Sequence, residues 1–405
     1  MDGGSRAAQR CLYRTTRTKS VRDTPVAPGP TAPDTRAPTG AQRRRPCPPG
    51  RARTSRRCAV NAPAKPSGTT YERAVHRLRR ALGPVDVAGG RALTGGLYNC
   101  VHLFELADGR RLVLKSAPSA EAPALTHERQ LLGTETIFHR LAATKGVSVP
   151  TVLHYEPAGP DDPGEWLLLD FLADSTWSEV GEDLPADGRP ALRHRLGSAL
   201  ARTATATGPR FGYPQPVPGL QGDTWLEAFT GMMHAVLKDA SRFGSPLPAA
   251  TDTLAALPDR FADALDEVSR PALVHFDAWE GNVILTRDGD GGWRFGGLID
   301  GERAFFGDPL AELVGLDPLG AAEDDPDLMA GYRSVTSDLP TTTPAARSRL
   351  ALYRIYLALI MRVESIPRAY GPEHSAWLRS WSTERITQQL AVLDRLAAGQ
   401  RLPSP

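Results

Sequence analysis

Apolar and polar positions divide the chain into a mixed α/β part followed by a mostly helical part. Apolar residues at helical spacing predict a short helix over 71–82. Two β-rich runs follow, at 101–106 and up to Lys115, and an Ala-Asp-Gly turn at 107–109 joins them. An Asp-Gly turn between such runs favours an antiparallel hairpin. A helix is then expected over 124–143, because its leucines, Ile and Phe share one face.

Two more strands complete the first part, at 147–156 and 165–172. The second of these is apolar almost throughout and runs into a linker. Beyond it the chain is mostly helical, and amphipathic helices over 346–365 and 374–398 close it. This pattern predicts an α+β fold, with an antiparallel sheet and a helix in a first lobe at 67–172 and a mostly helical second lobe at 173–405.

Charge separates residues 1–66 from the rest. This segment has 15 Lys and Arg against three acids, about +12, so about −10 remains for the body of a chain whose formal charge is +2. It is rich in Pro, Arg and Gly and poor in bulky apolar residues, a composition that predicts a disordered tail. A later translation start, for example at Val60, is an alternative. The dense prolines disfavour an amphipathic targeting helix, and we expect no nucleic-acid binding by the tail.

No apolar run resembles a signal peptide or a membrane span, and we expect no membrane partner. Three of the four cysteines lie in the tail and Cys100 is alone in the body, so the sequence shows neither a disulfide framework nor a zinc site. A reducing cytoplasm is therefore the expected location. The sequence leaves the oligomeric state open.

The candidate chemistry lies in two segments, LVHFDAWEGNVIL at 273–285 and GGLIDGERAFFGDP at 296–309. Transfer of a phosphoryl group to an alcohol needs one carboxylate for the attacking hydroxyl and another for a metal ion on the phosphates. Asp277 and Asp300 supply the two carboxylates, and Asn282 supplies an amide oxygen that suits Mg²⁺. Each of these residues alone is more often a turn or loop former; their order along the chain favours the chemical interpretation.

These two segments resemble those of the aminoglycoside phosphotransferase-like branch of the protein-kinase-like fold, which also holds choline and fructosamine kinases. The resemblance covers roughly residues 90–365. It implies an ATP-dependent (or GTP-dependent) kinase that phosphorylates a hydroxyl of a small-molecule acceptor. By this resemblance Asp277 is the catalytic base, Asn282 and Asp300 bind Mg²⁺, His275 braces the catalytic loop, and Asp308 is a structural aspartate.

The resemblance also implies a nucleotide site. Lys115 matches the lysine that pairs with the α- and β-phosphates, and its acidic partner is Glu135, with Glu128 as the alternative. The other implied nucleotide-binding residues lie in a glycine turn and in the hinge between the lobes: Gly95, Gly96, Asn99, Asp170 and Leu172.

Departures from the family concern packing and the acceptor. Phe276 stands where the family often has Gly.

Several acidic groups would suit a cationic, aminated acceptor: Glu302, Glu280 and the acidic run at 323–327. Such a run, however, is usually a solvated loop. Trp279 and an aromatic and Met group at 225–233 are candidates for an acceptor pocket or for core. Three functions stay open: a kinase of an aminoglycoside-like or other aminated, hydroxyl-rich acceptor, a metabolite or repair kinase of fructosamine-kinase type, and a non-catalytic nucleotide-binding pseudokinase.

Overall fold

The computed structural model describes residues 68–93, 98–172, 175–181, 183–336 and 339–400. The tail predicted for 1–66 and the glycine pair Gly95 and Gly96 lie outside these residues. Within them, none of the helices has the length and apolar character needed to cross a membrane.

The first part of the described chain is a five-stranded antiparallel sheet in the order β1-β2-β3-β5-β4. Its strands are β1 (Val87–Leu93), β2 (Cys100–Leu106), β3 (Arg111–Ser116), β4 (Val152–Glu156) and β5 (Trp166–Asp170). The Asp-Gly turn joins β2 to β3 as predicted, and Gly109 takes a φ of 86° that favours glycine.

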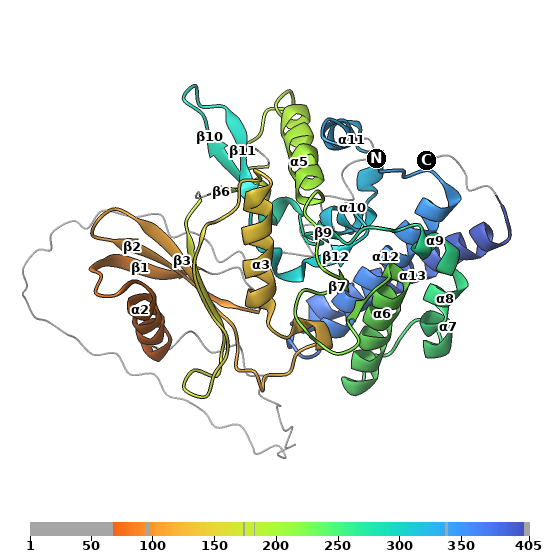
Figure 1. Ribbon diagram of the computed structural model, residues 1–405, viewed down its shortest axis with the longest axis horizontal. Coiled ribbons are helices and arrows are strands. Elements are labelled where there is room, and N and C mark those ends of the chain that lie inside the picture. Colours follow the sequence, from red (N-terminus) through yellow and green to blue (C-terminus); the bar gives the residue numbers. More distant parts are fainter. Residues whose placement is uncertain (1–67, 94–97, 173–174, 182, 337–338, 401–405) are drawn as a thin grey trace, which may run out of the picture.

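Strand periodicity decides what each face of this sheet meets. Leu112 and Leu114 of β3 belong to an apolar core shared with α2 (Gly68–Leu82). Val113 packs in a second apolar cluster, on the face of the sheet that α3 (Leu131–Thr144) covers. Because side chains alternate along a strand, Lys115 is on the same face as Val113, toward α3. Figure 1 shows α3 between the sheet and the helical part.

Helix α3 begins later than the sequence predicts. Gln130 has a φ of 59° in the left-handed region, which an α-helix cannot include. The predicted helix over 124–143 is therefore split into a short 3-10 turn, η2 (Thr126–Glu128), and α3 itself. Asp239 of α6 accepts hydrogen bonds from the backbone and hydroxyl of Thr126 at 2.6 and 2.9 Å, which holds η2 against the second part.

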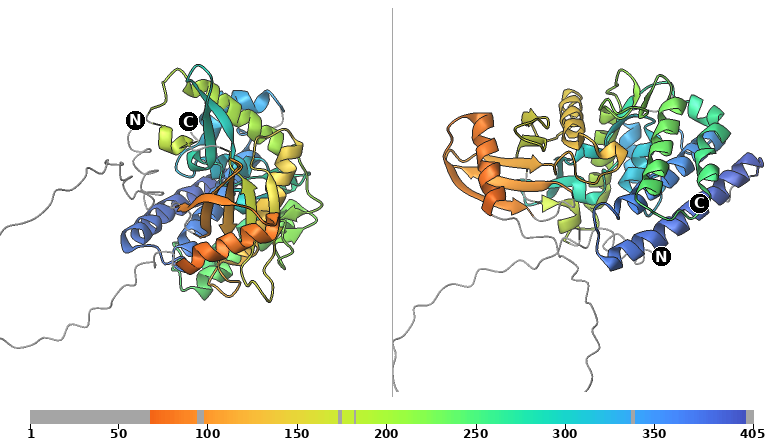
Figure 2. Two further views of the ribbon diagram at one scale, coloured as in Figure 1. Left: turned by 90° about the vertical axis from the view of Figure 1, so that its left-hand side faces the viewer. Right: turned by 90° about the horizontal axis from the view of Figure 1, so that it is seen from below.

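The second part is mostly helical, around a core formed by α6 (Trp225–Arg242) and α12 (Pro344–Glu364). Both predicted closing helices are present, α12 and α13 (Pro372–Ala397), and the two views in Figure 2 show α13 on the outer side. The other helices are α4 (Trp177–Val180), α5 (Arg189–Thr203), α7 (Thr251–Ala255), α8 (Leu257–Arg260), α9 (Ala262–Asp266), α10 (Leu310–Leu316) and α11 (Pro326–Arg333).

Two small sheets carry the candidate motifs. One has the order β11-β10-β6, and the other has the order β8-β7-β12-β9. Their strands are β6 (Ser175–Thr176), β7 (Phe211–Gly212), β8 (Gln221–Gly222), β9 (Ala272–Val274), β10 (Val283–Arg287), β11 (Trp293–Leu298) and β12 (Phe305–Gly307). The predicted α+β fold is confirmed; the boundary at residue 172 stays a prediction.

Candidate active site

The loop that follows β9 is held in place by hydrogen bonds of the His275 backbone and of both nitrogens of its ring. The His275 amide donates to Glu312 Oε2 at 2.7 Å, and Nε2 lies 2.9 Å from the carbonyl oxygen of Ile299. The amide of Asp277 donates to Nδ1 of the same ring at 3.2 Å. These contacts require Nε2 to donate and Nδ1 to accept, as in a neutral imidazole. Burial lowers the pKa of His275 to about 4, which keeps the ring neutral.

Phe276 occupies a left-handed backbone position, with a φ of 62°. This conformation favours glycine, and it costs a non-glycine residue about 1 kcal/mol or more. The buried Phe276 ring packs edge-on against Phe305, with ring centroids 5.0 Å apart. A Cβ at Gly315 of α10 would lie 2.3 Å from the Phe276 carbonyl, so α10 supports the backbone of this loop directly.

Asp277 contacts Asn282 within the loop and Arg303 outside it. Asn282 Nδ2 donates to the Asp277 carbonyl at 2.8 Å and to Oδ2 at 3.2 Å, and Arg303 Nε lies 3.8 Å from Oδ2. Burial raises the pKa of Asp277 to about 7; Arg303 opposes this rise, and Asp300 adds to it. A carboxyl group with a pKa near neutral is suited to accept a proton.

Lys115 lies between two carboxylates. Its Nζ is 2.6 Å from Glu135 Oε1 of α3 and also forms an ion pair with Asp300. Burial alone would lower the pKa of Lys115, but the two carboxylates outweigh burial and raise it. Burial would likewise raise the pKa of Glu135, but Lys115 and His139 lower it to about 2. Lys115 and Glu135 are therefore both charged, and they connect β3 to α3.

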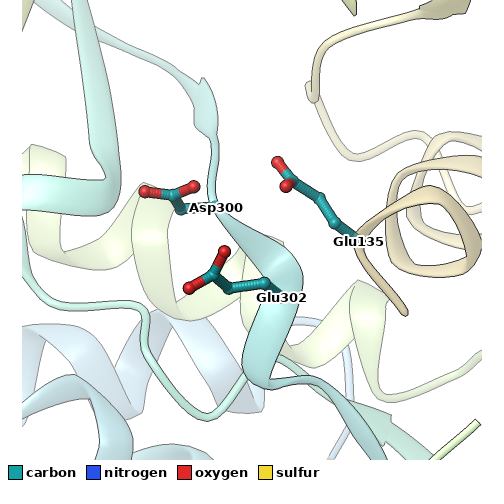
Figure 3. A group of neighbouring side chains, drawn as sticks. All are labelled: Glu135, Asp300 and Glu302. Atoms are coloured by element: carbon teal, nitrogen blue, oxygen red, sulfur yellow. The ribbon is translucent and has the colours of Figure 1, made fainter. Parts of the chain in front are cut away.

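Glu135, Asp300 and Glu302 converge on one point. Their carboxylates offer ligand atoms within 4.8 Å of one another, and Figure 3 shows Glu135 on α3 facing the other two. Asp300 has a φ of 63°, which turns the chain from β11 into η4 (Gly301–Arg303). Burial and the charge of Asp300 raise the pKa of Glu302 to about 8. Crowded oxygen ligands of one sign are a donor set that fits Mg²⁺.

Asn99 also reaches this cluster, since its Nδ2 donates to Glu302 Oε2 at 2.7 Å. The other end of the Asn99 amide, Oδ1, is buried without a hydrogen-bond partner among the described residues. Asn99, one of the implied nucleotide-binding residues, is therefore in contact with the acidic cluster.

The hinge residues Asp170 and Leu172 lie at the end of β5. Asp170 accepts a hydrogen bond from the Thr151 amide, which connects β5 to the start of β4. Leu172 lines a cleft of about 700 Å³ together with Phe171, Leu285 and Trp293. Lys115, Asp277 and Asp300 are not among the residues that line this cleft.

Two of the groups considered for acceptor binding have structural roles instead. Glu323 forms an ion pair with Arg354, and Asp325 caps α11 through the amides of Asp327 and Leu328. The members of the aromatic and Met group on α6 are buried core residues: Trp225, Phe229, Met232 and Met233.

Asp308 anchors the β12–α10 corner to α12, since it accepts a hydrogen bond from the Tyr353 hydroxyl at 2.8 Å and lies 2.9 Å from Arg349 Nε.

Sequence reasoning missed Glu312, Arg303 and Glu364. Glu312 is the one acid in the apolar segment LAELVGL of α10, and a lone buried acid is a detectable signal. Arg303 directly follows the predicted motif but carries no recognisable pattern. Glu364 lies at the end of α12, and only the fold brings it near the site.

Known proteins are similar to this chain over most of its length. Residues 89–352 match the family model of the phosphotransferase enzyme family. A probable ketoamine kinase from Synechocystis is 24% identical over 309 residues, which are 73% of this chain and 90% of that protein.

Two solved structures share the fold. A fructosamine-3-kinase-like protein from Thermobifida fusca has a TM-score of 0.55 at 20% identity, over 78% of this chain and 98% of that one. An aminoglycoside phosphotransferase in complex with AMP-PNP and hygromycin B has a TM-score of 0.53 at 18% identity, over 79% and 98%. Because the family match covers well over half of the sequence, the chain belongs to the phosphotransferase enzyme family and is a small-molecule kinase.

Proposed function

We propose that the protein transfers the γ-phosphoryl group of ATP, with Mg²⁺, to a hydroxyl of an aminated, hydroxyl-rich small molecule. The bond from the acceptor oxygen to phosphorus forms while the bond from phosphorus to the ADP oxygen breaks. The hydroxyl proton passes to Asp277. Transfer of this kind depends mainly on positioning and on charge neutralisation.

One hydrogen bond is the main support for this assignment. His275 Nε2 donates to the carbonyl oxygen of Ile299, the residue before Asp300, at 2.9 Å. It connects the loop that carries the proposed base to the segment that carries the proposed metal ligand. The relative position of Asp277 and Asp300 is therefore fixed by a buried, neutral ring rather than by mobile side chains.

The phosphates are assigned to the acidic cluster and Lys115. Asp300 and Asn282 would hold Mg²⁺, and Glu302 is an added candidate because its carboxylate lies in the same cluster. When bound, Mg²⁺ neutralises the charge of the phosphates. Lys115, braced by Glu135 at 2.6 Å, would contact the α- and β-phosphates. Asn99 and the glycine pair Gly95 and Gly96 would cover them, and the hinge backbone at Asp170–Leu172 would pair with the base of ATP or GTP.

The acceptor class rests on similarity and on charge. The similarity to a probable ketoamine kinase favours a second candidate acceptor, a sugar–amine adduct. A pseudokinase is disfavoured, because each residue type that the proposed chemistry needs is present, and Lys115 contacts both Glu135 and Asp300. Since the reaction consumes ATP, we expect it to take place in the cytoplasm.

The test is ADP release by a protein that starts near Ala64, with Mg·ATP and a panel of acceptors. The panel holds aminoglycosides, fructosamines, choline and simple sugars, and Asp277→Asn serves as the blank. Turnover of aminoglycosides or fructosamines supports the proposal and identifies the substrate type, whereas turnover of simple sugars or choline alone would support the phosphotransfer but contradict the acceptor class. No turnover of any acceptor, with Mg·ATP still bound, would contradict the proposed acceptor class.

A further inference from the structure

A chain of alternating charges leads away from Asp277. Arg303 Nε lies 3.8 Å from Asp277 Oδ2, and Arg303 Nη2 donates to Glu364 Oε2 at 2.8 Å. Glu364 lies 3.6 Å from Arg368 Nη2, and Arg368 Nε donates to Glu128 Oε1 at 3.1 Å. We call these five residues the charge chain.

The charge chain is buried except at its catalytic end. The Glu128, Glu364 and Arg368 side chains are 1%, 5% and 7% exposed, and Arg303 is 13% exposed. Asp277, at 25%, is the most exposed member. Buried ion pairs lose much of their solvation, so they persist only where each charge has partners that hold it in place. The charge chain therefore ends in the Asp277 carboxylate, which is the member most open to a substrate.

Within the described part of the chain, the two side chains that contact the Asp277 carboxylate reach the same oxygen. Asn282 Nδ2 donates to Oδ2 at 3.2 Å, and Arg303 Nε lies 3.8 Å from Oδ2. This arrangement leaves Oδ1 to accept the hydrogen bond of an acceptor hydroxyl. Because Asn282 and Arg303 both contact Oδ2, rotation of the carboxylate is restricted, and the direction in which Oδ1 points is fixed as well.

The charge chain also joins the two parts of the fold. Glu128 belongs to η2, between β3 and α3, and Oε2 of Glu128 accepts from the Leu125 amide at 2.7 Å. Arg368 follows α12, and its guanidinium lies over the Tyr98 ring, 5.0 Å from the centroid. Tyr98 directly precedes Asn99, which contacts the acidic cluster. The base is thereby connected to segments that border the proposed nucleotide site.

We propose that Arg303 is the positioning residue of the catalytic base, that Glu364 and Arg368 hold Arg303 in place, and that Glu128 braces Arg368 from the first part of the fold. The inference rests on the proposed function and deepens it. Misplacement of a reacting group by about 1 Å can cost about 10²-fold in rate. The charge chain would prevent such misplacement, and none of its members belongs to the acidic cluster assigned to the phosphates.

The first test is Arg303→Gln, measured with the acceptor found in the panel. We expect kcat to fall by about 10²-fold, while the acceptor KM and the stabilisation by Mg·ATP stay near wild type. Arg303→Lys keeps the charge but loses the planar fork, so it should recover part of kcat. Wild-type kcat in Arg303→Gln, or an equal loss in kcat and in Mg·ATP binding, would overturn the proposal.

The second test acts at the far end of the charge chain. Glu128→Gln should lower kcat by about tenfold, although Glu128 touches neither Asp277 nor the acidic cluster. Glu323→Gln is the matched control, because it breaks a similarly enclosed pair with Arg354, both 14% exposed, outside the charge chain. Equal kcat values for the two variants would show that bracing from Glu128 is absent.

Amide hydrogen exchange separates this inference from the proposed function, because it needs no acceptor. Arg303→Gln and Glu128→Gln should both speed exchange at residues 275–283, and Glu323→Gln should not. Failure of the whole panel with this exchange pattern intact would remove the proposed function and leave the charge chain as a brace of the loop. Unchanged exchange in Arg303→Gln would overturn the inference even if an acceptor turns over.

Discussion

The two sides of the proposed site, which we call the phosphate side and the acceptor side after their proposed roles, differ in how their charges are balanced. On the phosphate side, three carboxylates of Glu135, Asp300 and Glu302 surround one ammonium group, that of Lys115. On the acceptor side, the acids and arginines of the charge chain alternate, so each charge between its ends has a partner on either side. The first arrangement has an excess of negative charge, and the second is nearly balanced.

This difference separates the tasks of the two sides. Burial and the charge of Asp300 raise the pKa of Glu302, and a bound cation would relieve the repulsion between these carboxylates. A balanced chain needs no ligand to hold its geometry, so it can orient a base before the substrate arrives. We therefore expect ligand-dependent stability from the phosphate side and ligand-independent order from the acceptor side.

The largest effect is expected for Asp277→Asn. An amide cannot accept the hydroxyl proton, and general base catalysis contributes about 10²–10⁴-fold, so kcat should fall by about 10²–10⁴-fold. Stabilisation by Mg·ATP should stay near wild type, because Asp277 belongs to the acceptor side. ADP release and thermal unfolding measure the two quantities. Wild-type turnover by this variant would remove Asp277 from the role of base.

Asp300→Asn tests the phosphate side. It removes one carboxylate from the acidic cluster and weakens the site for a cation. In wild type, Mg·ATP at 100 times its Kd should raise the free energy of unfolding by about 2.7 kcal/mol. The same addition to Asp300→Asn should raise it by much less. Thermal unfolding with and without Mg·ATP measures it. An undiminished gain would contradict the metal-ligand assignment.

The smallest effect concerns His127, which precedes Glu128 of the charge chain and stacks on Tyr213 with ring centroids 5.3 Å apart. Burial lowers the pKa of His127 to about 4, so the folded state binds this proton less well than the unfolded state. Its contribution to the free energy of unfolding is present above about pH 6.5 and is lost as the pH falls toward 4.

The stability advantage of wild type over His127→Gln should therefore shrink by up to about 2 kcal/mol between pH 7 and pH 5. Denaturant unfolding at the two pH values gives the difference. The same substitution at His234, which is exposed on α6, is the control. A constant difference at both pH values would show that His127 is not buried as a neutral ring.

Much of the fold follows from local pattern. The β-rich run that ends at Lys115, the almost wholly apolar strand at 165–172, the Asp-Gly turn and the amphipathic closing helices are properties of neighbouring residues, and the sequence predicts each of them. The two motif segments also identify the residues that carry the candidate chemistry. The predicted helix over 124–143 is partly wrong, because the left-handed turn at Gln130 has no local signature.

Which side chains meet was decided mainly by tertiary structure. The sequence favoured Glu135 as the partner of Lys115, with Glu128 as the alternative; the fold pairs Glu135 with Lys115 and directs Glu128 to Arg368, 240 residues away. Contacts at such separation depend on how helices and sheets pack, and no local spacing encodes them. The sequence by itself determined the elements and the candidate chemistry of the two motifs. The charge chain arises only when α12 and η2 are brought together, because ion pairs need proximity in space, not in sequence.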